Sequence, residues 1–357
     1  MIARNSSFTY KGRAVDVKQV GRELGVRYLL EGSVRKSANR VRIAGQLIDA
    51  SSGAHLWADR FEGALEDVFE LQDQVTARVV GAIAPRLQQA EIARANRKPT
   101  ASLEAYDLFL RGLGNVYKYG REGNKEALHC YYKAIELDPD FSTAHAAAAA
   151  CFGNRKAFGW VIDREQEVAE ARRLALRAVQ LGKDDATVLS FAGYALAHVV
   201  RDLDDGAAFL DRALLINPNL ASGWASNGWV KVWLGKPDRA IESFAHAMRL
   251  SPMDPTLYSM QHGMAHAHFY AGRYEEALTW AKMALRELPD GYAALRIGAA
   301  SCALAGRDEE AKRLMARLLE IDPALRVANL QNVLGPYRHP EHPAKYGDAL
   351  RRAGLPE

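Results

Sequence analysis

Histidines are the residues of this 357-residue sequence whose spacing comes closest to a chemical site. His262 and His266 lie four positions apart, and His268 follows them. Two histidines at this spacing share one face of a helix and can both bind zinc. A zinc peptidase would place a glutamate after the first histidine, but Gly263 stands there and no third ligand is evident. We therefore predict no metal site, and a histidine–metal enzyme is kept only as an alternative.

Other common catalytic patterns do not occur. Cys130, Cys151 and Cys302 are scattered, and no arrangement of histidine and asparagine marks one of them as a nucleophile. We expect small buried thiols in a reducing compartment, which favours a cytoplasmic protein. The phosphate-binding pattern G-x-x-x-x-G-K-[ST] does not occur either. The sequence therefore predicts a protein that is not an enzyme and holds no cofactor.

Positive charge is concentrated at the amino-terminal end. The chain has a formal net charge of +4, whereas its first 42 residues hold ten basic and three acidic side chains. Such a patch can meet phosphate or a lipid surface, but no aromatic residues alternate with the basic ones as in a nucleic-acid groove. We interpret it as a solvated surface and expect no nucleic-acid partner. No apolar run reaches the ~18 residues of a membrane span.

A repeat of paired helices dominates the rest of the sequence. Four prolines each end a helix-like stretch, at spacings of 34, 37 and 34 residues: Pro218, Pro252, Pro289 and Pro323. A small residue lies twelve positions before each proline: Gly206, Ala240, Ala277 and Ala311. Small residues let two helices approach closely, and proline cannot continue the helix. A period of 34 residues is the spacing of tetratricopeptide repeats.

The sequence resembles the tetratricopeptide family at this point. The best copy consists of Trp224, Gly228, Ala240, Phe244, Ala247 and Pro252, and it departs from the family pattern at Lys231, where tyrosine is preferred. About six copies fit residues 101–324, and residues 325–357 are expected to form a capping helix and an exposed tail. The resemblance implies a mainly α solenoid of helical hairpins, in which the first helix of each pair lines a concave face.

The repeat frame places several aromatic and histidine side chains on that concave face. They are Phe191, His198, Trp229, Trp233, His262, His266 and Phe269. Aromatic rings bury much area at a low cost in conformational entropy, so such a face suits an extended peptide or a helix of a partner protein. The alternative is that some of these rings, Trp233 above all, pack between repeats as core.

The first hundred residues lack the repeat. Residues 16–24 predict a short helix that ends at Gly25, and three stretches read as antiparallel strands joined by hairpin turns: 28–35, 41–49 and 55–61. Apolar residues at helical spacing then predict a long helix from Leu65 to about Asn96. We divide this part into a small partial α/β domain at 1–63 and a connecting helix with linker at 64–100.

This order of elements resembles the later part of a TolB-type domain. The resemblance rests on Ser6-Ser7-Phe8, Gly25-Val26-Arg27-Tyr28, Glu31-Gly32-Ser33-Val34-Arg35 and Leu56-Trp57-Ala58. It implies an arrangement found in bacterial signalling proteins, above all in the carboxy-terminal region of class III adenylate or guanylate cyclases. The strand and helix that open such a domain are missing before Ser6, so we expect a truncated domain that is less stable than the solenoid or pairs with something.

The sequence thus favours a non-catalytic scaffold that binds a protein or peptide partner in bacterial cyclic-nucleotide signalling. Two alternatives stay open. One is the regulatory part of a cyclase-family protein whose catalytic domain is missing, and the other is the regulatory part of a DNA-binding transcription regulator.

Overall fold

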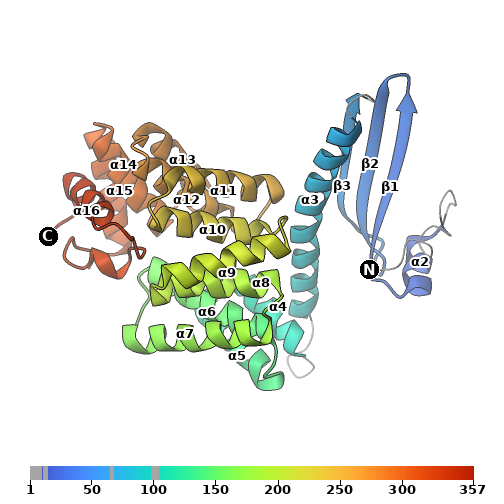
Figure 1. The fold of residues 1–357 in the computed structure, drawn as a ribbon, viewed down its shortest axis with the longest axis horizontal. Coiled ribbons are helices and arrows are strands. Elements are labelled where there is room, and N and C mark those ends of the chain that lie inside the picture. The colour runs from blue at the N-terminus through green and yellow to red at the C-terminus, as the bar shows by residue number, and fades with distance from the viewer. Residues whose placement is uncertain (1–9, 11–14, 65–67, 98–103) are drawn as a thin grey trace. The chain divides into compact units, whose positions relative to one another are not determined.

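The computed structural model describes residues 10, 15–64, 68–97 and 104–357 (Figure 1). Contacts between Cα atoms divide the chain into two compact units, Met1–Glu91 and Ile92–Glu357. The Ser6-Ser7-Phe8 motif, on which part of the TolB resemblance depends, lies outside the described residues.

The first unit contains a three-stranded antiparallel sheet in the order β1-β2-β3. The strands are β1 (Tyr28–Ser37), β2 (Arg40–Asp49) and β3 (His55–Ala64), and helix α2 (Val17–Leu24) precedes them. Gly25 ends α2 in the left-handed conformation, with φ of 63°. The predicted order of a helix followed by three antiparallel strands is confirmed. A TolB-type domain is not shown by these elements.

One face of this sheet is apolar, and only part of that face is covered. Val41 and Phe61 are buried, and Val75 and Val79 of helix α3 (Val68–Arg97) pack against them. On β1, Leu30 and Val34 are 56% and 69% exposed. The unit therefore has a very small buried core.

The second unit contains six helix pairs. They are α4 (Ala105–Val116) with α5 (Arg121–Leu137), α6 (Ser142–Ala157) with α7 (Arg164–Leu181), α8 (Ala186–Ala195) with α9 (Leu203–Ile216), α10 (Ala221–Trp233) with α11 (Pro237–Leu250), α12 (Leu257–Tyr270) with α13 (Tyr274–Glu287), and α14 (Tyr292–Leu304) with α15 (Asp308–Ile321). Successive hairpins pack on one another, so the predicted tetratricopeptide-type solenoid is confirmed, and the protein is mainly α.

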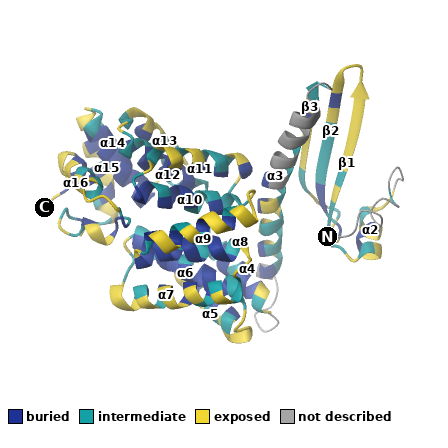
Figure 2. Ribbon diagram, in the orientation of Figure 1, coloured by how far each residue is buried: buried dark blue, intermediate teal, exposed yellow. Residues whose placement is uncertain are grey.

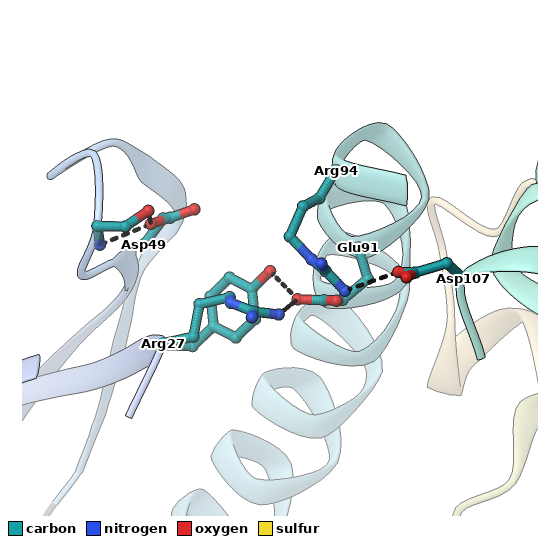
Figure 3. A network of polar contacts seen from close by, with 7 residues as sticks. Arg27, Asp49, Glu91, Arg94 and Asp107 are labelled. Atoms are coloured by element: carbon teal, nitrogen blue, oxygen red, sulfur yellow. Dashed lines mark hydrogen bonds and ion pairs between the residues drawn. The ribbon is translucent and has the colours of Figure 1, made fainter. Parts of the chain in front are cut away.

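Two carboxylates near the boundary between the units, Glu91 and Asp107, each form polar contacts within their own unit (Figure 3). In the first unit, Arg27 and the hydroxyl of Tyr28 both donate to Oε1 of Glu91 at 2.6 Å. In the second unit, Nη2 of Arg94 lies 3.3 Å from Oδ1 of the buried Asp107 in the first turn of α4. Each carboxylate is therefore held by a cation of its own unit.

The repeat frame predicted the close contacts between helices. Ala240, Ala277 and Ala311 are at most 1% exposed. Phe244 fills the space between neighbouring first helices, because a Cβ atom on Gly228 or on Gly263 would lie 2.8 or 2.4 Å from its ring. Small residues at these positions are thus required for the hairpins to stack.

Three features differ from the sequence-based expectation. The stretch from Gly153 to Trp160 departs from the repeat pattern and reads as an insertion, but residues 153–157 form the last turns of α6. Helix α8 continues into a π-helical turn, η2 (Leu196–Val200), which ends at Arg201 with φ of 68°. The sequence predicts a short capping helix at 348–354, whereas the carboxy-terminal helix α16 (Glu341–Arg352) begins seven residues earlier and buries Tyr346.

Candidate partner-binding surface

The first helices of the six pairs form the inner face of the solenoid, and they are more deeply buried than the second helices (Figure 2). In α14 every residue from Tyr292 to Ala303 is buried, whereas α15 buries only Ala311, Met315 and Leu318. A second helix is amphipathic because its outer side faces solvent. A first helix that is buried on all sides must also be covered on the inner face.

Aromatic and histidine side chains form a continuous stack on this inner face. The ring of His198, in the π-helical turn, stacks on Trp233 at 4.7 Å, and its Nδ1 lies 3.1 Å from the hydroxyl of Tyr194. Nζ of the buried Lys156 donates to the carbonyl oxygen of His198 at 2.5 Å. The π-helical turn, an uncommon element that often marks a functional position, thus sets the place of His198.

The stack continues through the next two repeats. Trp229 lies 5.8 Å from Trp233 and 4.9 and 5.3 Å from the rings of His262 and His266. Each of these two histidines uses Nδ1 to donate to the carbonyl oxygen four residues before it, Tyr258 for the first and His262 for the second. Both rings also pack against Trp229, so they act as packing groups in the stack.

Burial keeps these histidines uncharged. It lowers the pKa of His262 to about 4, with Arg296 as a further positive charge nearby. Burial also lowers the pKa of His266 and of His198, and neighbouring cations, Arg296 for both, add to the effect. At neutral pH the inner face is therefore aromatic and free of histidine charge.

The two phenylalanines that we predicted for this face lie apart from the stack. Phe269 is fully buried among Tyr270, Tyr274 and Tyr346. Phe191 is half-buried and packs between helices near Ala146. Both are packed as core, which is the alternative that the sequence left open for rings of this kind.

The open groove expected from the sequence is filled by the chain itself. His198, Trp229, Trp233, His262, His266 and Phe269 are each at most 9% exposed. Over Trp233 the cover comes from residues 333–342, which we call the C-terminal segment, and over His266 and Phe269 it comes from Tyr346. Such a cover is favourable because an uncovered row of rings would expose a large apolar area to water. The role of these side chains in partner binding stays a prediction.

The C-terminal segment fits closely against the ring stack. A Cβ atom on Gly335 would lie 2.0 Å from the indole nitrogen of Trp233, so only glycine fits there. The N–H of Arg338 donates to the carbonyl oxygen of Trp233 at 2.9 Å, and its guanidinium pairs with Asp204 at 2.5 Å. The ring of Tyr337 lies 5.0 Å from that of Tyr270.

A buried arginine lies beneath the C-terminal segment. Arg296 of α14 is 3% exposed, and its Nη2 donates to the carbonyl oxygen of Val333 at 3.4 Å. Its Nε and Nη1 have no hydrogen-bond partner among the described residues. The guanidinium also lies over the ring of Tyr292, at 5.0 Å from the centroid. Burial opposes its charge, but the nearby hydroxyls of Tyr346 and Tyr292 outweigh this and raise the pKa of Arg296. Among the described residues, no carboxylate forms an ion pair with it.

Sequence reasoning missed Arg296, Gly335, Tyr337 and Tyr346. We had interpreted the region around residues 339–342 as an exposed tail. One signal was present, since Gly335-Pro336-Tyr337 combines a glycine, a proline and an aromatic residue in a short segment, as extended peptide ligands often do. No pattern in the sequence indicates on which face such a segment docks.

The described residues hold neither a metal-binding cluster nor a membrane-spanning helix. No group of three or more His, Cys, Asp or Glu side chains in the described ranges is placed to hold a metal ion. No helix within residues 15–64, 68–97 or 104–357 is both long and apolar enough to cross a membrane.

The class that the fold defines is a helical-hairpin solenoid of the tetratricopeptide type. Among solved structures, the fold is similar to that of the APC/C hetero-tetramer Cut9–Hcn1, with a TM-score of 0.53 and 15% sequence identity. The match covers 81% of this chain and 52% of that chain. At this identity the likeness supports the fold alone.

Curated relatives match parts of the chain. A protein of Rhizobium meliloti (strain 1021) named putative adenylate cyclase 3 is 45% identical over 147 residues, which are 41% of this chain and 25% of the relative. The Protein CTR9 homolog of Arabidopsis thaliana is 29% identical over 117 residues, or 32% of this chain and 10% of the relative. The chain thus spans a quarter or less of the length of these relatives. No family model matches it.

Proposed function

We propose that this chain is a non-catalytic interaction module that binds a peptide or a helix of a partner protein on the inner face of its solenoid. One observation carries the proposal: the inner face already holds an extended stretch of polypeptide, the C-terminal segment. Gly335 lies against the ring of Trp233, Pro336 is buried, and the carbonyl oxygen of Trp233 accepts a main-chain hydrogen bond. These are the contacts by which a surface of this kind holds a peptide.

We further propose that the module acts in cyclic-nucleotide signalling, as the regulatory part of a cyclase-like protein. The 45% identity to the relative named putative adenylate cyclase 3 supports this. Cys130, Cys151 and Cys302 are unpaired and buried, which is consistent with a reducing, cytoplasmic setting. The purified chain should make no cyclic nucleotide from ATP or GTP. Measurable synthesis would show that the module is catalytic after all.

The test is capture of partners from native lysate with the full chain as bait. A second bait carries His262→Gln and His266→Gln, which change the inner face and keep the side-chain size. A control bait carries Leu215→Ala and Met253→Ala, which are 85% and 64% exposed. We expect a partner that the wild type and the control retain and that the inner-face variant loses, with all three baits folded by circular dichroism. Loss with the control alone would place binding on the outer surface and contradict the proposal.

Hydrogen exchange would then locate the contact. Binding of the captured partner should slow amide exchange in α10 and α12, whose side chains form most of the ring stack. Protection confined to the second helices would contradict the inner-face assignment.

A further inference from the structure

We propose that the C-terminal segment is an internal occupant of the partner surface, and that a partner displaces it with a segment that brings a carboxylate to Arg296. This inference depends on the proposed function and specifies the chemistry of the partner. It follows from three features of the described residues: how the segment is held, what it leaves unsatisfied, and the charges at its edge.

Few contacts hold the C-terminal segment on the inner face beyond its first two residues. Residues 335–337 have no regular secondary structure, and the next residue, Arg338, donates one main-chain hydrogen bond to the carbonyl oxygen of Trp233. The ion pair of Arg338 with Asp204 is solvent-exposed on both sides, and such pairs contribute little. Val333 and Leu334 anchor the start of the segment in the core, and after them the remaining contacts are the packing of Gly335 on Trp233 and of Tyr337 on Tyr270. An occupant held in this way can exchange with another one.

The segment is also a poor partner for Arg296. It offers the guanidinium one carbonyl oxygen at 3.4 Å and leaves Nε and Nη1 unsatisfied, although the side chain is 3% exposed. A buried cation without a counter-charge is unfavourable. A carboxylate at the position of the Val333 carbonyl would form shorter, charge-assisted and bidentate hydrogen bonds. The buried charge therefore favours an acidic side chain in the incoming segment.

The edge of the C-terminal segment has a matching charge. An open pocket of about 460 Å³ lies beside it, lined among others by Arg172, Arg201, Asp202, Asp204, Tyr337 and Arg338. Asp204 pairs with Arg338, and Asp202 caps the first turn of α9. Among the described residues, Arg172 and Arg201 form no ion pair, so two arginines are left to meet an acidic chain. The pocket gives such a chain a place to begin displacement.

The test uses two labelled peptides and fluorescence anisotropy. One peptide has the chain's own sequence from Gln331 to His342, and the second has the same sequence with Val333→Glu. Each is added to the full wild-type chain and to the Gly335→Val variant, whose side chain cannot fit against Trp233. We expect the variant to bind the own-sequence peptide at least about tenfold more tightly than the wild type does.

The acidic peptide decides the partner chemistry. We expect the peptide with Val333→Glu to bind the Gly335→Val variant of the protein about tenfold more tightly than the own-sequence peptide does. Adding Arg296→Gln to the chain should abolish that preference. Equal binding of both peptides would overturn the carboxylate assignment. Equal binding by wild type and a folded Gly335→Val chain would overturn the internal-occupant assignment.

Hydrogen exchange of the wild type keeps the proposal testable if Gly335→Val does not fold. The amide of Arg338 should exchange at least about tenfold faster than the amides of α14, because the segment opens without global unfolding. Equal protection would show that the segment is permanent core. If neither peptide binds the Gly335→Val variant but a partner is still captured on the inner face, this inference is contradicted and the proposed function is not. If capture maps to the outer surface, the proposed function falls instead.

Discussion

Gly335 lies flat against the indole of Trp233, so close that a Cβ atom at this position would be 2.0 Å from the ring nitrogen. The two residues belong to the C-terminal segment and to the fourth helix pair. Their contact closes the inner face over His198, which stacks on the same indole at 4.7 Å. A glycine in an irregular segment is thus a packing requirement of a distant repeat, and the contact links the last part of the solenoid to its centre.

The C-terminal segment should depend on Tyr337 for its stability and hardly on Arg338. The ring of Tyr337 packs on Tyr270, whereas the guanidinium of Arg338 and its partner Asp204 are 42% and 84% exposed. We expect Tyr337→Ala to lower the free energy of unfolding by about 2 kcal/mol. Arg338→Ala should cost about 0.5 kcal/mol, because its main-chain bond to Trp233 is kept. Urea unfolding measures both, and a larger loss for Arg338→Ala would contradict the packing argument.

Phe244 should be one of the most sensitive positions of the solenoid. Its ring is fully buried between Gly228 and Gly263. Phe244→Ala would leave a cavity that the stacked backbones cannot close, so we expect a loss of about 3–5 kcal/mol. Leu215→Ala is the matched control, since Leu215 is 85% exposed and its change should stay within about 0.5 kcal/mol. Thermal or urea unfolding of the wild type and the two variants measures these losses. Similar losses of free energy for the two variants would contradict the packing of Phe244 between the first helices.

The period of the sequence determines which residues lie between the helices. Ala240, Ala277 and Phe244 were all found from the 34-residue frame, because each repeat must bury the same positions against its neighbours. The short turns followed for the same reason. Gly235 and Gly272 adopt φ of 73° and 78°, as a helix end in the left-handed conformation requires. Local and nearest-neighbour contacts are what a repeat can encode.

The inner face could not be predicted in the same way. The frame placed Trp233 and His262 on the correct helices, but it carries no information on what covers them. The cover is a contact between Gly335 and Trp233 that depends on how the whole solenoid coils. The π-helical turn at His198 also has no sequence signal, since one extra residue in a helical turn leaves the apolar pattern almost unchanged.

The three cysteines should be unreactive in the native protein. Burial raises the pKa of Cys151 to about 12 and that of Cys302 to about 11, and it also raises the pKa of Cys130. Because the thiolate is the reactive form, we expect negligible reaction with a disulfide reagent at pH 8 over minutes. All three should react at once in denaturant. Fast reaction of one thiol in the native chain would contradict its burial.

Lys156 should make stability rise with pH above neutrality. Burial, together with the charges of Arg201 and Arg164, lowers its pKa to about 7, whereas an unfolded lysine has a value near 10.4. Between these values the unfolded chain binds more protons, so folding becomes more favourable as the pH rises. The gain from Lys156 between pH 7 and 8.5 should be about 1.5 kcal/mol. Lys156→Met should lack this part of the slope in urea unfolding, and an unchanged slope would contradict the burial of its charge.

The buried histidines should make stability fall below pH 6.5. The folded-state pKa of His262 is lowered to about 4, and those of His266 and His198 are lowered too. In the unfolded chain they titrate near 6.5, so between the two values the unfolded state binds the extra protons. Stability from these groups is complete above pH 6.5 and is lost as the pH falls toward 4. Each histidine contributes up to about 1.4 kcal/mol per pH unit in that window.

Urea unfolding at pH 7.5, 6 and 5 measures this slope. The double variant His262→Gln/His266→Gln should lose the part of the slope that these two buried groups supply, while His198 and the less buried histidines of lowered pKa, His246, His268 and His342, keep theirs. His129→Gln, which changes an exposed histidine of α5, is the control and should keep the wild-type slope. If the double variant keeps that slope as well, the inner-face histidines accept protons in the folded chain. The ring stack around Trp229 would then have to tolerate charge, and the inner face would be open to water.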